Sequence, residues 1–158
     1  MGQIYQAVNV DAIIDQYHIE NFVETGTGIA DSLSWVVNLQ KDINMYSVEV
    51  MEDLYYKNVE KLKNVANLHL KLGYTHEVLP QILTEMSAAP TLFFHDAHFP
   101  GADFGYAGYG SEQSEIKRIP LEIELNIVSE NRNCSSDVFI IDDLRIYNRP
   151  LELLELAT

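Results

Sequence analysis

Short apolar runs alternate along the chain with longer amphipathic segments, and this alternation predicts the fold. Five apolar runs have the length of strands, and the segments between them carry apolar residues at helical spacing. The expected strands cover residues 21–24, 45–50, 67–72, 91–96 and 137–143. The expected helices cover residues 3–19, 29–40, 51–63, 77–86 and 121–129. Strands and helices that alternate in this way are typical of an α/β domain with a mostly parallel sheet.

The same periodicity predicts which helix residues face the sheet. In the helix over residues 29–40, the apolar face carries Ile29, Leu33, Val36 and Val37. In the helix over residues 51–63, it carries Leu54, Tyr55, Val59 and Leu62. Right-handed crossovers place helices on both faces of a parallel sheet, so we expect a three-layer α/β/α sandwich. The length of 158 residues suits one domain, with residues 1–19 as a lead-in helix and residues 144–158 as a C-terminal tail.

A glycine turn follows the first predicted strand and is typical of a ligand-binding loop. The sequence here is Glu24, Thr25, Gly26, Thr27 and Gly28, and an amphipathic segment comes next. Glycine lets the backbone turn sharply and approach a ligand, and the following helix offers unpaired N–H groups. The turn lacks a basic cluster or a phosphate-binding lysine motif, which favours a nucleoside-like ligand without phosphates. An ordinary strand-to-helix turn is the alternative interpretation.

Acidic residues close four of the five predicted strands. They are Glu24, Glu49, Asp96 and the pair Asp142 and Asp143. The carboxyl ends of parallel strands meet at one edge of the sheet, and ligands bind at that edge. Glu49, which ends the second strand, suits a ribose, because one carboxylate can accept hydrogen bonds from both hydroxyls. For each acid taken singly, capping of the following helix is the structural alternative.

With these residues in view, the chain resembles the class I S-adenosylmethionine-dependent methyltransferases. Residues 23–28 resemble the first motif of that family, and Glu49 stands where its ribose-binding acid stands. Residues 72–80 resemble its third-strand segment, where Tyr74 replaces the Asp or Asn that commonly contacts adenine. The resemblance spans roughly residues 20–147 and implies a Rossmann-like fold. The cofactor site that it implies consists of Glu24, Thr25, Gly26, Thr27, Gly28, Glu49, Val50, Gly73, Tyr74, Thr75 and Asp96.

Residues 94–98 and 141–143 resemble a narrower group, the metal-dependent small-molecule O-methyltransferases. In this group an Asp after strand four and two adjacent acids after strand five hold magnesium. The resemblance therefore implies Asp96, Asp142 and Asp143 as ligands. Magnesium prefers hard oxygen ligands and keeps several waters, which leaves room for the oxygens of a substrate. Asp96 is expected either to hold the metal or to face the methionine end of the cofactor.

Two histidines lie beside Asp96. The base of the resembling group lies two residues past the first metal-binding Asp, which implies His98 here. An imidazole can accept a proton near neutral pH, and a metal-bound hydroxyl releases its proton more easily. A loop imidazole bonded to the backbone is the alternative for His98. His95 lies on a buried strand, so we expect it to be a core histidine.

The end of the sequence predicts an open sheet edge. About fifteen residues follow Asp143, too few for the helix and two antiparallel strands that usually complete this methyltransferase fold. We therefore expect about five strands in the order 3-2-1-4-5, without the C-terminal strand pair. An exposed edge invites pairing, so we expect a homo-oligomer that forms through the fifth strand or through residues 151–156. A monomer in sedimentation would contradict this expectation.

Charge and cysteine content narrow the possible partners. The net charge is −14, from 24 acidic against 10 basic side chains, which argues against nucleic acids and anionic membranes. The single cysteine, Cys134, excludes a disulfide framework and a thiolate metal cluster. Residues 1–4 lack the basic and apolar regions of a secretory signal, so we expect a cytoplasmic protein.

These observations predict an enzyme that moves a methyl group from S-adenosylmethionine to a hydroxyl of a small molecule, assisted by Mg²⁺. Residues 99–119, rich in glycine and tyrosine, would close over the acceptor. A catalytically degenerate module that binds the cofactor, or an oligomeric partner protein, is the alternative. A third possibility is an enzyme that breaks the same cofactor down.

Overall fold

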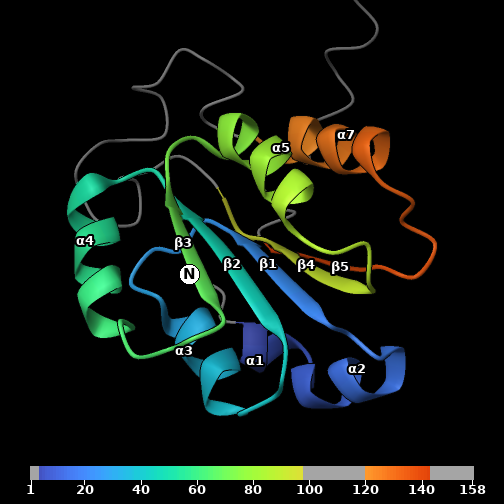
Figure 1. The fold of residues 1–158 in the computed structure, drawn as a ribbon, viewed down its shortest axis with the longest axis horizontal. Helices are drawn as coiled ribbons and strands as arrows, with labels where there is room; N and C mark the ends of the chain where they lie inside the picture. The colour runs from blue at the N-terminus through green and yellow to red at the C-terminus, as the bar shows by residue number, and fades with distance from the viewer. Residues whose placement is uncertain (1–3, 98–119, 143–158) are drawn as a thin grey trace, which may run out of the picture.

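A computed structural model describes residues 4–97 and 120–142 of the chain. Within them lie the strands β1 (Asn21–Thr25), β2 (Asn44–Glu49), β3 (Leu68–Leu72), β4 (Thr91–His95) and β5 (Val138–Ile141). They form one sheet in the order β3-β2-β1-β4-β5 (Figure 1). Every neighbouring pair is parallel. The predicted Rossmann-like fold, its strand order and the parallel direction of its strands are therefore confirmed.

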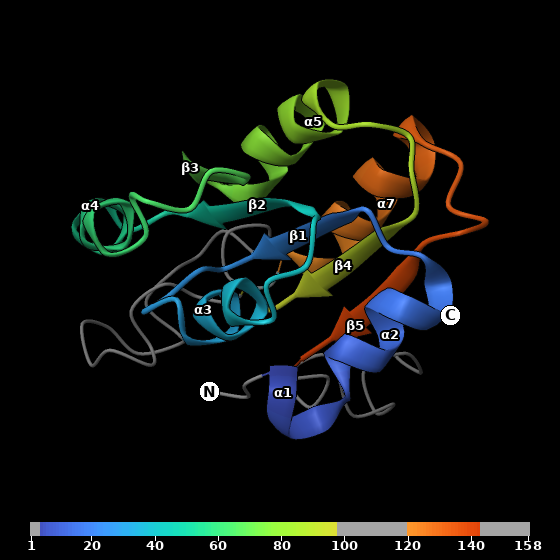
Figure 2. The ribbon, with the colours of Figure 1, turned by 60° about the horizontal axis from the view of Figure 1, so that its bottom comes forward.

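Helices cover both faces of the sheet. They are α1 (Ile4–Ala7), α2 (Val10–Tyr17), α3 (Asp31–Asn38), α4 (Glu52–Lys61), α5 (Thr75–Glu85) and α7 (Leu121–Asn131). Figure 2 shows α5 and α7 side by side on one face, α1 to α3 on the other, and α4 beside β3. The three-layer arrangement follows from the right-handed crossovers between parallel strands. No helix within the described residues is long and apolar enough to cross a membrane.

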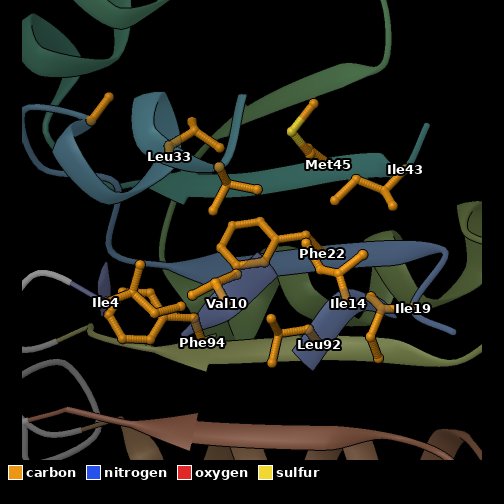
Figure 3. Close-up of a cluster of buried hydrophobic side chains, with 12 residues drawn as sticks. Ile4, Val10, Ile14, Ile19, Phe22, Leu33, Ile43, Met45, Leu92 and Phe94 are labelled. Carbon is orange, nitrogen blue, oxygen red and sulfur yellow. The ribbon is translucent and has the colours of Figure 1, made fainter. Parts of the chain in front are cut away.

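Apolar cores lie on both faces of the sheet because successive strand residues point to opposite sides. Phe22 and Val23, neighbours in β1, are both fully buried but belong to different cores. Figure 3 shows the core under α1 to α3, where Phe22, Leu92 and Phe94 meet residues of those helices. The central strands β1 and β4 are buried along their whole length, as continuous apolar runs predict. β5 is only half-buried and, among the described strands, ends the sheet.

The single N-terminal helix predicted over residues 3–19 is wrong, because the segment forms two helices. The break falls between α1 and α2, at Val8 and Asn9. The Asn9 side chain accepts a hydrogen bond from the backbone N–H of Ala12 at 3.1 Å and so caps α2. The apolar spacing continues across the break because both helices pack on the same core. Periodicity alone therefore does not reveal the cap.

Two residues predicted to face the sheet are exposed. Val59 in α4 is 38% exposed, whereas its neighbour Asn58 is 3% exposed. Ile29 precedes α3 and is 44% exposed. The inward prediction for Val59 is wrong because the contact between α4 and the glycine turn, described below, sets the rotation of α4. The inward prediction for Ile29 is wrong because this residue lies in the turn before α3 and has no place on the face of that helix. The predicted loop over residues 99–119 and the C-terminal tail lie outside the described residues.

Candidate functional site

Four acidic residues lie at the carboxyl edge of the sheet. Glu24 and Glu49 lie at the ends of β1 and β2, and Asp96 and Asp142 directly follow β4 and β5. The strands run in register, with the last residue of β4 opposite the last residues of β1 and β5. The structure thus brings these acids from distant parts of the sequence to one edge.

The glycine turn packs tightly between β2 and the end of β4. Gly26 and Gly28 have φ angles of 84° and 54°, and the N–H of Gly26 donates to the carbonyl of Val48 at 3.0 Å. A Cβ atom on Gly26 would lie 2.8 Å from the carbonyl oxygen of Asp96 and 2.9 Å from Cα of Ala97. Only glycine fits this position, because both the positive φ and the backbone contact exclude a side chain.

Glu49 fastens the turn to β2. Its Oε2 accepts from the N–H of Gly28 at 2.7 Å, and its Oε1 accepts from the N–H of Met51 at 2.7 Å. Burial raises the pKa of the Glu49 carboxyl, and the hydrogen bonds from Met51 and Gly28 oppose that rise. Each carboxylate oxygen has further acceptor capacity. Glu49 can therefore hold the turn and still accept hydrogen bonds from the hydroxyls of a ligand.

Glu24 lies beneath the turn in a neutral form. The side chain is 1% exposed, and its Oε2 accepts from Oγ of Ser47 at 2.6 Å. The same hydroxyl lies 2.6 Å from Oγ1 of Thr27, so a chain of hydrogen bonds links the acid to the turn. Burial raises the pKa of Glu24 to about 8, against the opposing hydrogen bond from Ser47. Glu24 is therefore mostly protonated at pH 7 and supports the turn from below.

Helix α4 supports the turn from its carbonyl side, a contact that the sequence interpretation missed. Nδ2 of Asn58 donates to the carbonyl of Gly28 at 2.8 Å, and Nζ of Lys61 donates to the carbonyl of Ile29 at 3.0 Å. Residues three apart share a helix face, so Asn58 and Lys61 point the same way. Asn58 is a poor helix former, but Asp53 in the same helix is equally poor, so the sequence gives no distinct signal for this contact.

Replacing Asn58 with Ala is expected to lower the free energy of unfolding by about 1–2 kcal/mol, because the carbonyl of Gly28 loses its donor. Urea denaturation measures this change. Lys57→Ala is the matched control, since Lys57 is exposed on the same helix and should change stability by less than about 0.5 kcal/mol. Equal stability of Asn58→Ala and Lys57→Ala would contradict the supporting role of Asn58.

The remaining predicted cofactor residues lie beside Glu49, at the ends of β2 and β3. The N–H of Gly73 donates to the carbonyl of Glu49 at 2.9 Å. Tyr74 precedes α5, and its ring lies 5.7 Å from the ring of His76. Val50 follows β2, and the buried Thr75 begins α5. These residues therefore lie at the same edge of the sheet as Glu49, and their role in binding adenosine stays a prediction.

Asp96 and Asp142 lie at adjoining strand ends. The N–H of Asp96 donates to the carbonyl of Thr25 at 3.1 Å, and the N–H of Asp142 donates to the carbonyl of His95 at 3.0 Å. Carboxylate oxygens are ligands that Mg²⁺ prefers, so the chemistry of Asp96 and Asp142 suits this ion. No group of three metal-binding side chains occurs within residues 4–97 and 120–142. The other predicted ligand, Asp143, and the predicted base, His98, lie outside the described residues.

His95 is buried, as expected of a core histidine, but it also has an acidic partner that the sequence interpretation missed. Its Nδ1 lies 2.7 Å from Oε2 of Glu124 in α7. Its ring stacks on that of Phe139, with 6.1 Å between the ring centroids. Glu124 is one of three acids in α7, and it shares a helix face with the buried Leu121 and Val128, whereas Glu122 and Glu130 are exposed. This helical spacing is the signal in the sequence that could have identified Glu124.

Comparison with solved structures identifies a similar fold in a protein described as "a putative caffeoyl-CoA O-methyltransferase" from Staphylococcus aureus. The TM-score is 0.59, the sequence identity is 15%, and the alignment covers 92% of this chain. The two proteins share one fold. At this identity the likeness establishes the fold alone, and this chain spans 64% of the length of the other chain. Neither a family model nor a curated protein matches the sequence.

Proposed function

We propose that this chain binds S-adenosylmethionine and transfers its methyl group to a hydroxyl of a small molecule. The observation that carries the proposal is the glycine turn held between Glu49 and the end of β4. This turn lies where parallel α/β sheets bind ligands, at the carboxyl edge and the start of a helix. A solved structure with this fold has an O-methyltransferase description, which supports the same reaction class.

Each part of the site has a distinct role in this proposal. Glu49 would accept hydrogen bonds from the ribose hydroxyls, and Gly26 and Gly28 would let the backbone approach the ligand. S-adenosylmethionine supplies an electrophilic methyl group when it is bound. Asp96 and Asp142 would orient the acceptor hydroxyl beside that methyl group.

Asp96, Asp142 and Asp143 would hold Mg²⁺ in this proposal. The ion, when bound, would make the acceptor hydroxyl more acidic. His98 would take the proton of that hydroxyl, because an imidazole accepts protons near neutral pH. The two carboxylates that the structure places at adjoining strand ends support the metal part of the proposal.

A methyl-transfer assay tests the reaction. The protein is incubated with labelled S-adenosylmethionine and a panel of phenols and sugars, with and without Mg²⁺. We expect labelled product that requires Mg²⁺. In Asp142→Asn the rate of product formation should fall at least about tenfold, because an uncharged NH2 group replaces one carboxylate oxygen. Glu122→Gln, an exposed acid on α7, is the matched control and should keep full activity.

Two results would contradict parts of the proposal. Cofactor binding without product from any acceptor would favour the alternative of a degenerate binding module. Product formation that ignores both Mg²⁺ and Asp142→Asn would remove the metal from the mechanism and leave the transfer itself intact.

A further inference from the structure

One carboxylate oxygen joins the ends of β1 and β4 to helix α7. Oε2 of Glu124 accepts a hydrogen bond from Oγ1 of Thr25 at 3.0 Å, and Nδ1 of His95 lies 2.7 Å from the same oxygen. The three residues are between 1% and 3% exposed. Thr25 and His95 are register partners in the sheet, so the carboxylate spans two neighbouring strands from one side.

The two strand ends held by Glu124 lead directly into the proposed site. Thr25 immediately precedes Gly26, and its carbonyl accepts from the N–H of Asp96 at 3.1 Å. His95 immediately precedes Asp96, and its carbonyl accepts from the N–H of Asp142 at 3.0 Å. A displacement of Thr25 or His95 is therefore transmitted through the backbone to the glycine turn and to both acids.

Packing alone does not account for this polar group. Among residues 4–97 and 120–142, no hydrogen-bond partner occurs for the buried Oε1 of Glu124 or the buried Nε2 of His95. A buried polar atom without a partner destabilises the folded state. The His95 ring stacks against the apolar rings of Phe93 and Phe139. A role at the adjacent candidate site, at the carboxyl edge of the sheet, would explain why polar side chains occupy this buried position.

We propose that Glu124 is a positioning residue that sets the spacing between the cofactor turn and the acidic edge. It acts through Thr25 and His95 and touches neither cofactor nor acceptor. The inference rests on the proposed function, because it concerns the same site. Methyl transfer requires the reacting groups to be held within a fraction of an ångström, so a small shift of one strand end lowers affinity and rate.

Replacing all three polar side chains with apolar ones distinguishes a positioning role from a contribution to stability. The triple variant Thr25→Val, His95→Phe and Glu124→Met removes every polar atom of the group, including the two unpartnered ones. We expect the triple variant to unfold at the same or a higher urea concentration than the wild type. Calorimetry should show binding of S-adenosylhomocysteine in the presence of Mg²⁺ weakened at least about tenfold, because the strand ends lose their common anchor.

Single variants of Glu124 keep the inference testable if the triple variant fails to fold. Glu124→Gln retains an oxygen acceptor and should bind S-adenosylhomocysteine within about threefold of the wild type, whereas Glu124→Met should bind at least about tenfold more weakly. Glu130→Gln, exposed on the same helix, is the control and should bind normally. Unchanged binding in a folded triple variant or in Glu124→Met would overturn the inference.

The wild-type titration separates the two proposals. Wild-type protein that binds neither S-adenosylhomocysteine nor Mg²⁺ would overturn the proposed function and, with it, the positioning role. Wild-type protein that binds normally while Glu124→Met also binds normally would overturn the positioning role alone.

Discussion

The Glu24→Gln variant is expected to become more stable than the wild type as the pH rises from 4.5 to 8. Burial raises the pKa of Glu24 from its ordinary value of 4.5 to about 8, so the folded protein keeps a proton that the unfolded chain releases. Within this window, wild-type unfolding releases about one proton, and stability falls by about 1.4 kcal/mol per pH unit. Below pH 4.5 both states hold the proton, and above pH 8 neither does, so the curve flattens outside the window.

Glutamine cannot ionise, yet its side-chain oxygen can still accept the hydrogen bond from Ser47. The difference in unfolding free energy between variant and wild type should therefore grow by on the order of 4 kcal/mol across the window. Urea denaturation at pH 5, 6, 7, 8 and 9 measures that difference. Glu52→Gln, exposed in the first turn of α4, should show none. Parallel stability curves for Glu24→Gln and the wild type would show that Glu24 ionises normally in the folded state.

The Gly26→Ala variant is expected to lose both stability and cofactor binding. The added Cβ atom would lie 2.8 Å from the carbonyl oxygen of Asp96 and 2.9 Å from Cα of Ala97. Both neighbours are backbone atoms, so a side-chain rotation cannot relieve the overlap. The φ angle of 84° adds about 1–2 kcal/mol for a residue with a Cβ atom. Together we expect a loss of at least about 3 kcal/mol of unfolding free energy.

Calorimetry gives the functional part of the Gly26→Ala prediction. The turn can accommodate a side chain only by moving away from β4, and that movement also displaces Gly28 from Glu49. Binding of S-adenosylhomocysteine should therefore fall below detection at millimolar protein. Wild-type stability and affinity in Gly26→Ala would mean that the turn is looser than the structure indicates.

The sequence predicted the central strands well because burial on both faces gives them continuous apolar runs. β4 is a continuous apolar run, typical of a central strand covered by helices on both sides. Glu24, Glu49, Asp96 and Asp142 come at the ends of apolar runs, so their convergence follows from the parallel direction of the strands.

Features that depend on single hydrogen bonds, whether local or between distant residues, could not be predicted from the apolar periodicity. The break at Asn9 depends on a local cap within a continuous apolar pattern. The inward rotation of Asn58 depends on the carbonyl of Gly28, 30 residues earlier in the sequence. Glu124 meets Thr25 across 99 residues, and no local pattern connects them. Periodicity reports the average face of a helix, whereas these contacts are set by single hydrogen bonds in the folded protein.

Glu24 and Glu49 both close predicted strands, but the structure gives them different surroundings and different roles. Glu24 is buried, mostly protonated at pH 7 and bonded to Ser47, so it shapes the turn. Glu49 accepts hydrogen bonds from the backbone N–H groups of Gly28 and Met51, and its oxygens can still accept hydrogen bonds from a ligand. Of the two, Glu49 is therefore the better candidate for direct contact with a ribose.

Calorimetric titration of the wild type and Glu49→Gln with S-adenosylhomocysteine tests the central claim most directly. The product of methyl transfer carries the same adenosine as the cofactor, so it probes the glycine turn and Glu49 without requiring an acceptor. We expect the wild type to bind one equivalent, and Glu49→Gln to bind at least about tenfold more weakly, because one acceptor oxygen is replaced by an NH2 group that can only donate hydrogen bonds. The absence of binding by the wild type, or equal affinity in Glu49→Gln, would contradict the assignment of this turn as a cofactor site.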